Sequence, residues 1–268
     1  MKTAMHIKLT DVQAVYSGAE GCLWELLMGE QIHIGGLQSS TDLAERAGIA
    51  AGSRGVDLCC CTGAGMRFLL RFRQAAHMTG VDATRKVLEL GRQRAAAEGF
   101  ADRTAFVEAD VCASGLPAGG FDFVWGEDAW CYVGDKAKLI AEAARLVRPG
   151  GAIAFTDWLE GPTPMTDDEA KRYLGFMKFP SVLSLADYRA LLEARGCQVR
   201  VAHDTGRFPK YVPLYLAMIE QQLTYDALKI IGFDTALAGA LIGEMRFMQT
   251  LAEAGKIIQG LIVAQRSA

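Results

Sequence analysis

Short apolar runs alternate with helical patterns through the middle of the chain. The first run, GVDLCCC at 55–61, ends in Thr-Gly-Ala-Gly and is followed by MRFLLRFRQA, whose apolar residues have helical spacing. The same alternation predicts further strands at 77–84, 104–111, 121–129 and 151–158. Strands that alternate with crossover helices predict a parallel sheet with helices on both faces. Ligands of such sheets bind beyond the carboxyl ends of the strands.

The flanking segments have a different pattern. Residues 9–30 are mostly helical in pattern, and TDLAERAGI at 41–49 predicts a helix with Thr41 as its cap and Glu45 in its first turn. After a proline-bearing insertion at 160–180, a helix and a sixth strand are expected, and IIQGLIVAQR at 257–266 is expected as the seventh.

The helical stretch between the last two strands is too long for a hairpin and is interpreted as a lid. We therefore expect three regions: a helical cap over the site at 1–50, an α/β core at 51–160, and the rest of the sheet at 161–268, with the substrate-side lid at about 209–255.

Composition narrows the class of ligand. The 268 residues include 28 Lys and Arg against 31 Asp and Glu, a formal net charge of −3 that gives no electrostatic footprint for nucleic acid or anionic lipid. No apolar run approaches the roughly 18 residues of a membrane span. The N-terminus lacks the apolar core of a secretory signal, so a cytosolic location is expected. The seven cysteines lack paired spacing, which favours reduced thiols. A small-molecule substrate is expected, and the sequence does not indicate an oligomeric state.

Acidic residues follow three successive predicted strands. Asp57 opens the Asp-Leu-Cys-Cys-Cys-Thr-Gly-Ala-Gly loop, Asp82 ends the second strand, and Asp110 ends the third. A carboxylate at the second position can accept both hydroxyls of a ribose, and one at the third can accept an adenine amine. The sequence therefore predicts a nucleotide-like ligand at this edge of the sheet.

Residues 50–160 resemble the class I S-adenosylmethionine-dependent methyltransferases. The resemblance rests on the loop from Asp57 to Gly65, on Asp82 and Asp110, and on Leu-Val-Arg-Pro-Gly-Gly at 146–151. It implies a Rossmann-like, seven-stranded α/β sheet with an N-terminal helical cap and a helical insert before the last strand. A dinucleotide-binding dehydrogenase is disfavoured, because Cys61-Thr-Gly-Ala-Gly65 lacks the Gly-x-Gly-x-x-Gly register.

The loop departs from that family at two positions. Cys59 and Cys61 stand where the family has glycines, which serve where a side chain would strike the ligand or where φ is positive. Consecutive cysteines cannot point their sulfurs at one ion, so no metal site is expected. Cys60 is expected to pack in the core, and Cys59 and Cys61 to line the ligand.

A narrower resemblance covers the N-terminal segment from Tyr16 to Gly36. It is similar to the glycine/sarcosine/dimethylglycine and the phosphoethanolamine N-methyltransferases, in which a helix and loop close over the sulfonium. The two resemblances together imply cofactor contacts from Trp24, His33, Ile34, Asp57, Cys59, Cys61, Gly63, Asp82, Ala83, Asp110, Val111 and Glu127.

The same resemblance implies a substrate side with three candidate catalytic residues. Tyr16 and Tyr132 would form a latch, because tyrosine is a poor base at neutral pH, and Asp128 would face an amine. Trp24, Trp130 and Trp158 would supply aromatic faces suited to a cation or a flat substrate. Lys178 and Tyr211 complete the expected substrate contacts, and a lone Lys178 disfavours a phosphorylated substrate.

The sequence thus predicts methyl transfer from S-adenosylmethionine to a small molecule, first of all to a nitrogen of an amine or amino acid. Two alternatives stay open. Cys59 and Cys61 could reflect altered group-transfer chemistry, such as another one-carbon carrier or removal of a leaving group, or the chain could be a catalytically silent binding protein of this fold.

Overall fold

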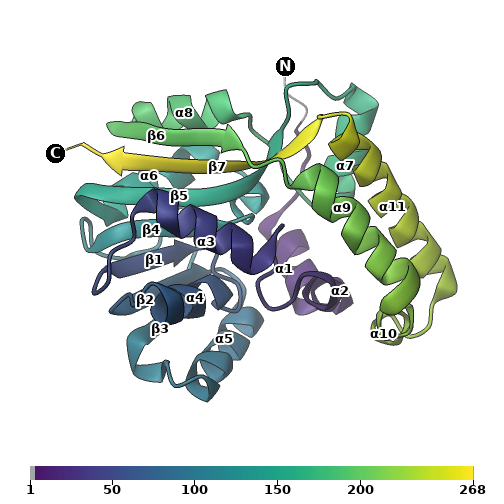
Figure 1. The fold of residues 1–268 in the computed structure, drawn as a ribbon, viewed down its shortest axis with the longest axis horizontal. Helices are drawn as coiled ribbons and strands as arrows, with labels where there is room; N and C mark the ends of the chain where they lie inside the picture. Colours follow the sequence, from purple (N-terminus) through teal and green to yellow (C-terminus); the bar gives the residue numbers. More distant parts are fainter. Residues whose placement is uncertain (1–3, 268) are drawn as a thin grey trace.

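A seven-stranded sheet in the order β3-β2-β1-β4-β5-β7-β6 forms the body of the protein (Figure 1). The computed structural model describes residues 4–267; residues 1–3 and 268, at the ends of the expected cap and of the C-terminal region, lie outside the described residues. The strands are β1 (Arg54–Leu58), β2 (His77–Asp82), β3 (Thr104–Glu108), β4 (Phe121–Glu127), β5 (Val147–Glu160), β6 (Cys197–Asp204) and β7 (Ile257–Arg266). The predicted seven-stranded α/β architecture is confirmed.

The predicted parallel sheet comprises the first five strands, and the last strand runs in the opposite direction. β1 to β5 pair in parallel, whereas β7 pairs antiparallel with both β5 and β6. The chain leaves β6 and returns to β7 at the same edge of the sheet, where Asp204 pairs with Gly260. A chain that returns at the edge it left must run backward, so β7 cannot be parallel to β6.

Helices cover both faces of the sheet. On one face lie α3 (Gly36–Ala47), α4 (Ala64–Phe72) and α5 (Arg85–Ala97), and on the other α6 (Lys136–Leu146) and α8 (Leu185–Glu193). The side chains of β4 alternate accordingly: Phe123 and Trp125 pack with α3 and α4, whereas Val124 packs with α6. Burial on both faces explains why the parallel strands are continuous apolar runs.

Two local expectations need correction or refinement. α3 begins at Gly36 after Gly35, which has φ of 87°, so Thr41 is not a cap; its hydroxyl donates to the carbonyl of Leu37 inside the helix. The expected turn at 148–151 is an irregularity in the β4–β5 pairing, since Phe121 pairs with Val147 and Phe123 with Ala152.

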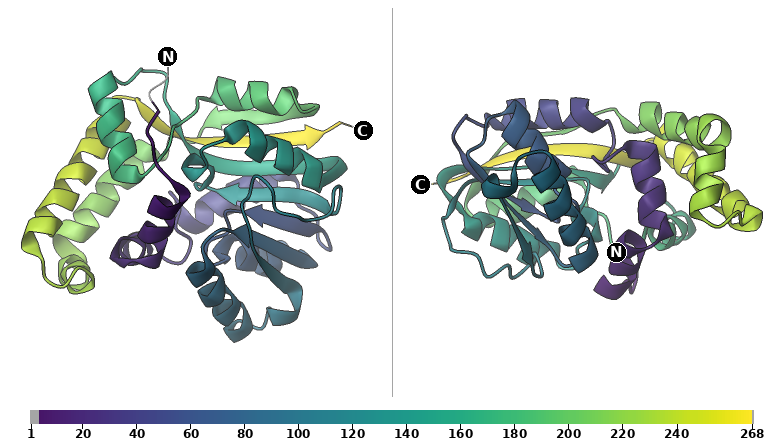
Figure 2. Two further views of the ribbon diagram at one scale, coloured as in Figure 1. Left: turned by 180° about the vertical axis from the view of Figure 1, so that it is seen from behind. Right: turned by 90° about the horizontal axis from the view of Figure 1, so that it is seen from below.

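The remaining helices lie beyond the carboxyl edge of the sheet. They are α1 (Leu9–Ser17), α2 (Ala19–Met28), α7 (Asp167–Met177), α9 (Phe208–Ala217), α10 (Thr224–Ile230) and α11 (Thr235–Glu253), with short turns at Ala101–Arg103, Trp130–Tyr132 and Met218–Gln222. Figure 2 shows α9 to α11 extending past the sheet, with α1 and α2 between them and the strands. One apolar cluster joins all six of these helices, and it includes Trp24, Trp158, Phe208 and Met248. No helix in the described part of the chain is long and apolar enough to cross a membrane.

Candidate functional site

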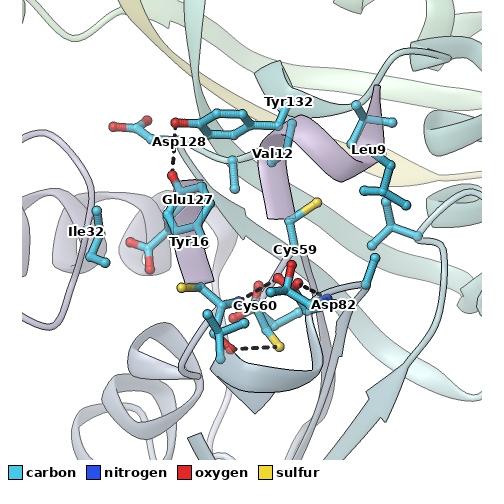
Figure 3. A pocket seen from close by; sticks show the side chains of 18 of the residues that line it. Leu9, Val12, Tyr16, Ile32, Cys59, Cys60, Asp82, Glu127, Asp128 and Tyr132 are labelled. Carbon is cyan, nitrogen blue, oxygen red and sulfur yellow. Dashed lines mark hydrogen bonds between the residues drawn. The ribbon is translucent and has the colours of Figure 1, made fainter. Parts of the chain in front are cut away.

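A cavity of about 340 Å³ lies at the carboxyl ends of β1 to β4, beneath α1 and the segment that follows α2 (Figure 3). Its wall contains Ile7, Leu9, Val12, Tyr16, residues 30–33, Asp57, Cys59, Cys60, Cys61, Thr62, Ala64, Gly65, residues 82–84, Val87, residues 110–112, residues 127–129, residues 132–135, Lys138 and Pro180. The loops after successive parallel strands thus meet at one place, as the strand order requires.

The loop after β1 carries backbone strain. Cys59 and Cys61 have φ of 64° and 48°, in the left-handed region that glycine adopts freely and that costs other residues about 1–2 kcal/mol. Both thiols line the cavity, as the sequence predicted. Burial raises the pKa of the Cys59 and Cys61 thiols, so both are protonated at neutral pH. Small neutral thiols therefore occupy ligand-facing positions where a larger side chain would fill the cavity.

Three strand-end carboxylates face this cavity. Asp82 accepts hydrogen bonds from the backbone N–H of Cys61 at 3.0 Å and of Thr84 at 2.8 Å, and Asp110 accepts one from Cys112 at 2.8 Å. Burial raises the pKa of Asp57 well above its usual range, and the nearby Glu127 raises it further. Burial also raises the pKa of Asp82, against the effect of its backbone hydrogen bonds. The fixed oxygens of Asp82 and Asp110 suit the hydroxyls and amine of an adenosyl group.

A second polar group joins the cap to the end of β4. Ser40 donates to Glu127 Oε1 at 2.6 Å, His33 Nε2 lies 3.3 Å from the same oxygen, and Trp125 donates to Glu127 Oε2 at 3.0 Å. A Cβ on Gly65 would lie 2.8 Å from Glu127 Oε2, so only glycine leaves room for this carboxylate. His33 and Glu127, both predicted from the sequence, thus lie together in the cavity wall.

The predicted tyrosine latch is present in the structure. The hydroxyls of Tyr16 and Tyr132 are 2.9 Å apart, and their rings meet edge to face with centroids 5.4 Å apart (Figure 3). Burial raises the pKa of both phenols well above the usual value. Neither hydroxyl is therefore a base at neutral pH, and their hydrogen bond joins α1 to the turn after β4.

Asp128 borders the cavity but is not free to bind an amine. Its carboxylate accepts a hydrogen bond from the N–H of Ile34 at 2.8 Å, and its two oxygens accept from the side-chain amide of Gln259 at 2.8 and 3.1 Å. Gln259 also donates to the carbonyl of Ile34 at 3.0 Å. These bonds fix the segment at 33–34 against the sheet, and the role of Asp128 toward an amine stays a prediction.

The expected aromatic wall is not found at this cavity. The Trp130 indole donates to the carbonyl of Leu58 and stacks on Phe155 in the core, and Trp24 and Trp158 are buried in the apolar cluster of the cap. All three side chains are buried, on helix α2, on the turn after β4 and on strand β5, and none of the three lines this cavity; their substrate contacts stay predictions.

Four further predicted residues lie outside the cavity wall. Ile34 is fully buried, and a Cβ on Gly63 would face the Phe106 ring. Lys178 donates to the carbonyl of Gly175, and Tyr211 donates to Gln38. The described residues of the expected lid at 209–255 do not line this cavity either. Their helices cover the cap instead.

Sequence reasoning missed several residues of the site. Thr62, Gly65, Thr84 and Cys112 line the cavity, and Ser40 and Gln259 hold its wall. Gln259 had a signal: it interrupts the apolar run IIQGLIVA at 257–264, and a polar side chain buried in such a strand requires partners.

Comparison with known proteins places these features in a family. A methyltransferase-domain model matches residues 56–155. The chain is 30% identical over 205 residues to 27-O-demethylrifamycin SV methyltransferase of Amycolatopsis mediterranei, covering 70% of this chain and 74% of the relative. It is 23% identical to glycine/sarcosine/dimethylglycine N-methyltransferase of Actinopolyspora halophila over 80% of this chain, although it spans only 39% of that relative.

A solved structure shares the fold. Phosphoethanolamine N-methyltransferase 2 of Haemonchus contortus, in complex with phosphomonomethylethanolamine and S-adenosylhomocysteine, superposes with a TM-score of 0.85 at 19% identity, covering 96% of this chain and 59% of that one. The resemblance predicted from the sequence is confirmed, and S-adenosylmethionine is the cofactor. The strand-end carboxylates and the glycine at 65 fit its ribose, adenine and methionine groups.

Replacing Asp82 by alanine is expected to weaken binding of S-adenosylhomocysteine by about 1–3 kcal/mol, because the ribose hydroxyls lose a charged acceptor. Isothermal titration calorimetry measures the change, with Asp102→Ala, an exposed carboxylate outside the cavity, as the control. An unchanged affinity would remove the ribose role from Asp82.

The positive φ at Cys59 makes a prediction about stability. Cys59→Gly is expected to be more stable than Cys59→Ala by about 1 kcal/mol or more, because only alanine retains the left-handed strain. The free energy of unfolding in urea gives the comparison. Cys22, exposed within α2, is the matched control, where the glycine variant should be about 1 kcal/mol less stable than the alanine variant. The same order at both positions would contradict the strain argument.

Tyr16→Phe and Tyr132→Phe each remove the latch hydrogen bond and keep the ring. Turnover should fall roughly five-fold or more, while affinity for S-adenosylhomocysteine changes little. Because both variants delete the same hydrogen bond, the turnover of the double variant should be no lower than that of the less active single variant. Additive losses, or wild-type kinetics, would refute the latch.

Proposed function

Because the chain belongs to the S-adenosylmethionine-dependent methyltransferases, we propose that it methylates a hydroxyl oxygen of an uncharged, mainly apolar small molecule. The cofactor supplies an electrophilic methyl group already activated as a sulfonium. The protein then has to hold the acceptor in line and exclude water, and these effects supply most of the rate gain.

The observation that carries the proposal is the hydroxyl of Tyr173 on α7. Tyr173 is fully buried, and its hydroxyl has no hydrogen-bond partner in the described structure. It lies in the apolar cluster next to the latch, since Phe179 contacts the rings of both Tyr132 and Tyr173, with centroids 4.8 and 5.8 Å apart. A buried hydroxyl without a partner costs free energy, so it suits a polar atom of a bound ligand.

The surroundings of Tyr173 favour an uncharged acceptor. Trp158, Phe179 and Met177 belong to the same buried cluster. The nearest buried carboxylates are already engaged: Asp128 binds Ile34 and Gln259, and Asp157 accepts from the N–H of Cys131 at 2.9 Å and the hydroxyl of Tyr188 at 2.7 Å. An ammonium ion transferred into such a cluster would lack a counter-charge, which is costly.

The relatives support the same acceptor. The relative with 30% identity is named for the 27-O position of its substrate, and this chain covers 74% of it. The amine nitrogen predicted from the sequence is the second candidate, favoured by the similarity to glycine/sarcosine/dimethylglycine N-methyltransferase over 80% of the chain.

An acceptor panel distinguishes the two. The purified protein with S-adenosylmethionine is offered uncharged aliphatic alcohols, phenols and hydroxylated macrolactones in parallel with glycine, sarcosine and phosphoethanolamine. Formation of S-adenosylhomocysteine and the mass of the product are followed. Methyl ethers from the hydroxylated compounds are expected, and methylated amines from the second group would overturn the proposal.

With the best acceptor of that panel, Tyr173→Phe tests whether the buried hydroxyl of Tyr173 binds the acceptor. The acceptor KM should rise roughly five-fold, the value of one lost hydrogen bond, while the affinity for S-adenosylhomocysteine stays unchanged. Tyr225→Phe, on an exposed tyrosine of α10, is the matched control. An unchanged acceptor KM would remove Tyr173 from the acceptor site.

A further inference from the structure

Two arginines outside the catalytic groups connect the cofactor loop to the cap. Arg67 on α4 is only 4% exposed, and its guanidinium donates to the carbonyl of Thr62 at 2.6 Å, to Glu98 at 2.7 Å and to Glu30. Thr62 belongs to the loop after β1, and Glu30 follows α2 in the cavity wall. One buried cation therefore holds both sides of the cavity.

Arg94 on α5 repeats this arrangement. It donates to Glu25 of α2 at 2.5 Å and to the hydroxyl of Thr62 at 3.4 Å, and it lies 3.9 Å from Glu30. The two arginines thus bind the same loop residue and two glutamates of the cap. Arg guanidinium suits this role, since its five donors lie in a fixed fork.

Thr62 is the residue at which this contact affects the cofactor. It is buried, lines the cavity, and lies between Cys61 and Gly63, whose φ values are 48° and 71°. Strained backbone persists when its surroundings fix it, and the arginines supply two of the bonds that do so. If the cap moved away, Arg67 would stay buried beside the loop and would lose Glu30 as a partner.

We propose that Arg67 and Arg94 form an ionic latch, in which Glu25 and Glu30 of the cap and Thr62 of the cofactor loop are held together, and that opening of this latch limits the release of the cofactor product. Arg67 and Arg94 are positioning residues in this scheme. They act on the cofactor through Thr62 and through the cap that covers it.

The glutamates are the better sites for mutation. Glu30 is 49% exposed and Glu25 is 30% exposed, so Glu25→Gln and Glu30→Gln keep shape and folding while removing the cap's charges. Two ion pairs, one with the buried Arg67 and one with the partly buried Arg94, correspond to a roughly five- to thirty-fold effect on a rate. Salt should screen the pairs, because the Debye length is about 10 Å at about 0.1 M.

The experiment is stopped-flow measurement of the dissociation rate of S-adenosylhomocysteine, from about 0.05 to about 0.5 M NaCl. The wild-type rate should rise with salt, whereas the Glu25→Gln/Glu30→Gln variant should release roughly five- to thirty-fold faster at low salt and respond little to salt. Glu244→Gln, which breaks the exposed pair with Arg172 at 3.0 Å, should behave as wild type.

Melting temperature separates positioning from folding. The double variant should melt within a few degrees of the wild type, because Arg67 keeps its hydrogen bonds to Glu98 and to the carbonyl of Thr62. Arg94→Lys retains the charge and loses the fork, so its release rate should lie between those of the wild type and the double variant. A wild-type release rate in the double variant, or a salt response equal to that of the wild type, would overturn the proposed ionic latch even if the melting temperature falls.

Discussion

The site depends on the buried carboxylate of Asp128. It follows the last residue of β4, has φ of 50°, and accepts hydrogen bonds from the cap segment at Ile34 and from Gln259 of β7. Three parts of the chain that are remote in sequence therefore meet at one charge. A buried carboxylate is stable only when its hydrogen bonds are satisfied, so the cap segment and the last strand are fixed in place together. His33 and Glu127, which precede Ile34 and Asp128 in the chain, take their positions from that arrangement.

The cysteine-bearing loop after β1 is also held in place by hydrogen bonds from residues remote in sequence. Its geometry is that of a glycine loop, and φ is positive at Cys59 and Cys61 although neither residue is glycine. The Asp82 carboxylate binds the N–H of Cys61, and Arg67 binds the carbonyl of Thr62, so the loop is fixed from both of its sides. Side chains of the core thus compensate for a conformation that the local sequence disfavours.

Local patterns predicted the α/β core and the carboxylate side of the cavity. Strand and helix periodicity, and acids such as Asp82 and Asp110 at strand ends, depend on neighbours in sequence and on the one rule that parallel strands share a carboxyl edge. The direction of Trp130 could not be predicted, because the turn of a few residues that carries it decides whether its ring faces the core or the ligand. Trp130 turns inward to reach the carbonyl of Leu58, a partner 72 residues earlier.

Hydrogen bonds between polar residues that are far apart in sequence could not be predicted either. The alternatives for Asp128, an amine ligand or a structural contact, differ only in whether a buried amide faces it, and Gln259 lies 131 residues away. The antiparallel direction of β7 could not be predicted from local patterns, since it depends on the edge of the sheet at which the chain re-enters after the helical insert.

The pairing of β6 with β7 determines which part of the chain can vary in length. β6 ends and β7 begins as hydrogen-bonded neighbours, with Asp204 opposite Gly260, so the helices α9 to α11 form a long excursion whose two ends are held together by the sheet. The entropic cost of closing such a segment grows only slowly with its length. The excursion can therefore be lengthened, shortened or exchanged with little effect on the strands that hold the cofactor, which makes it the modular part of this architecture.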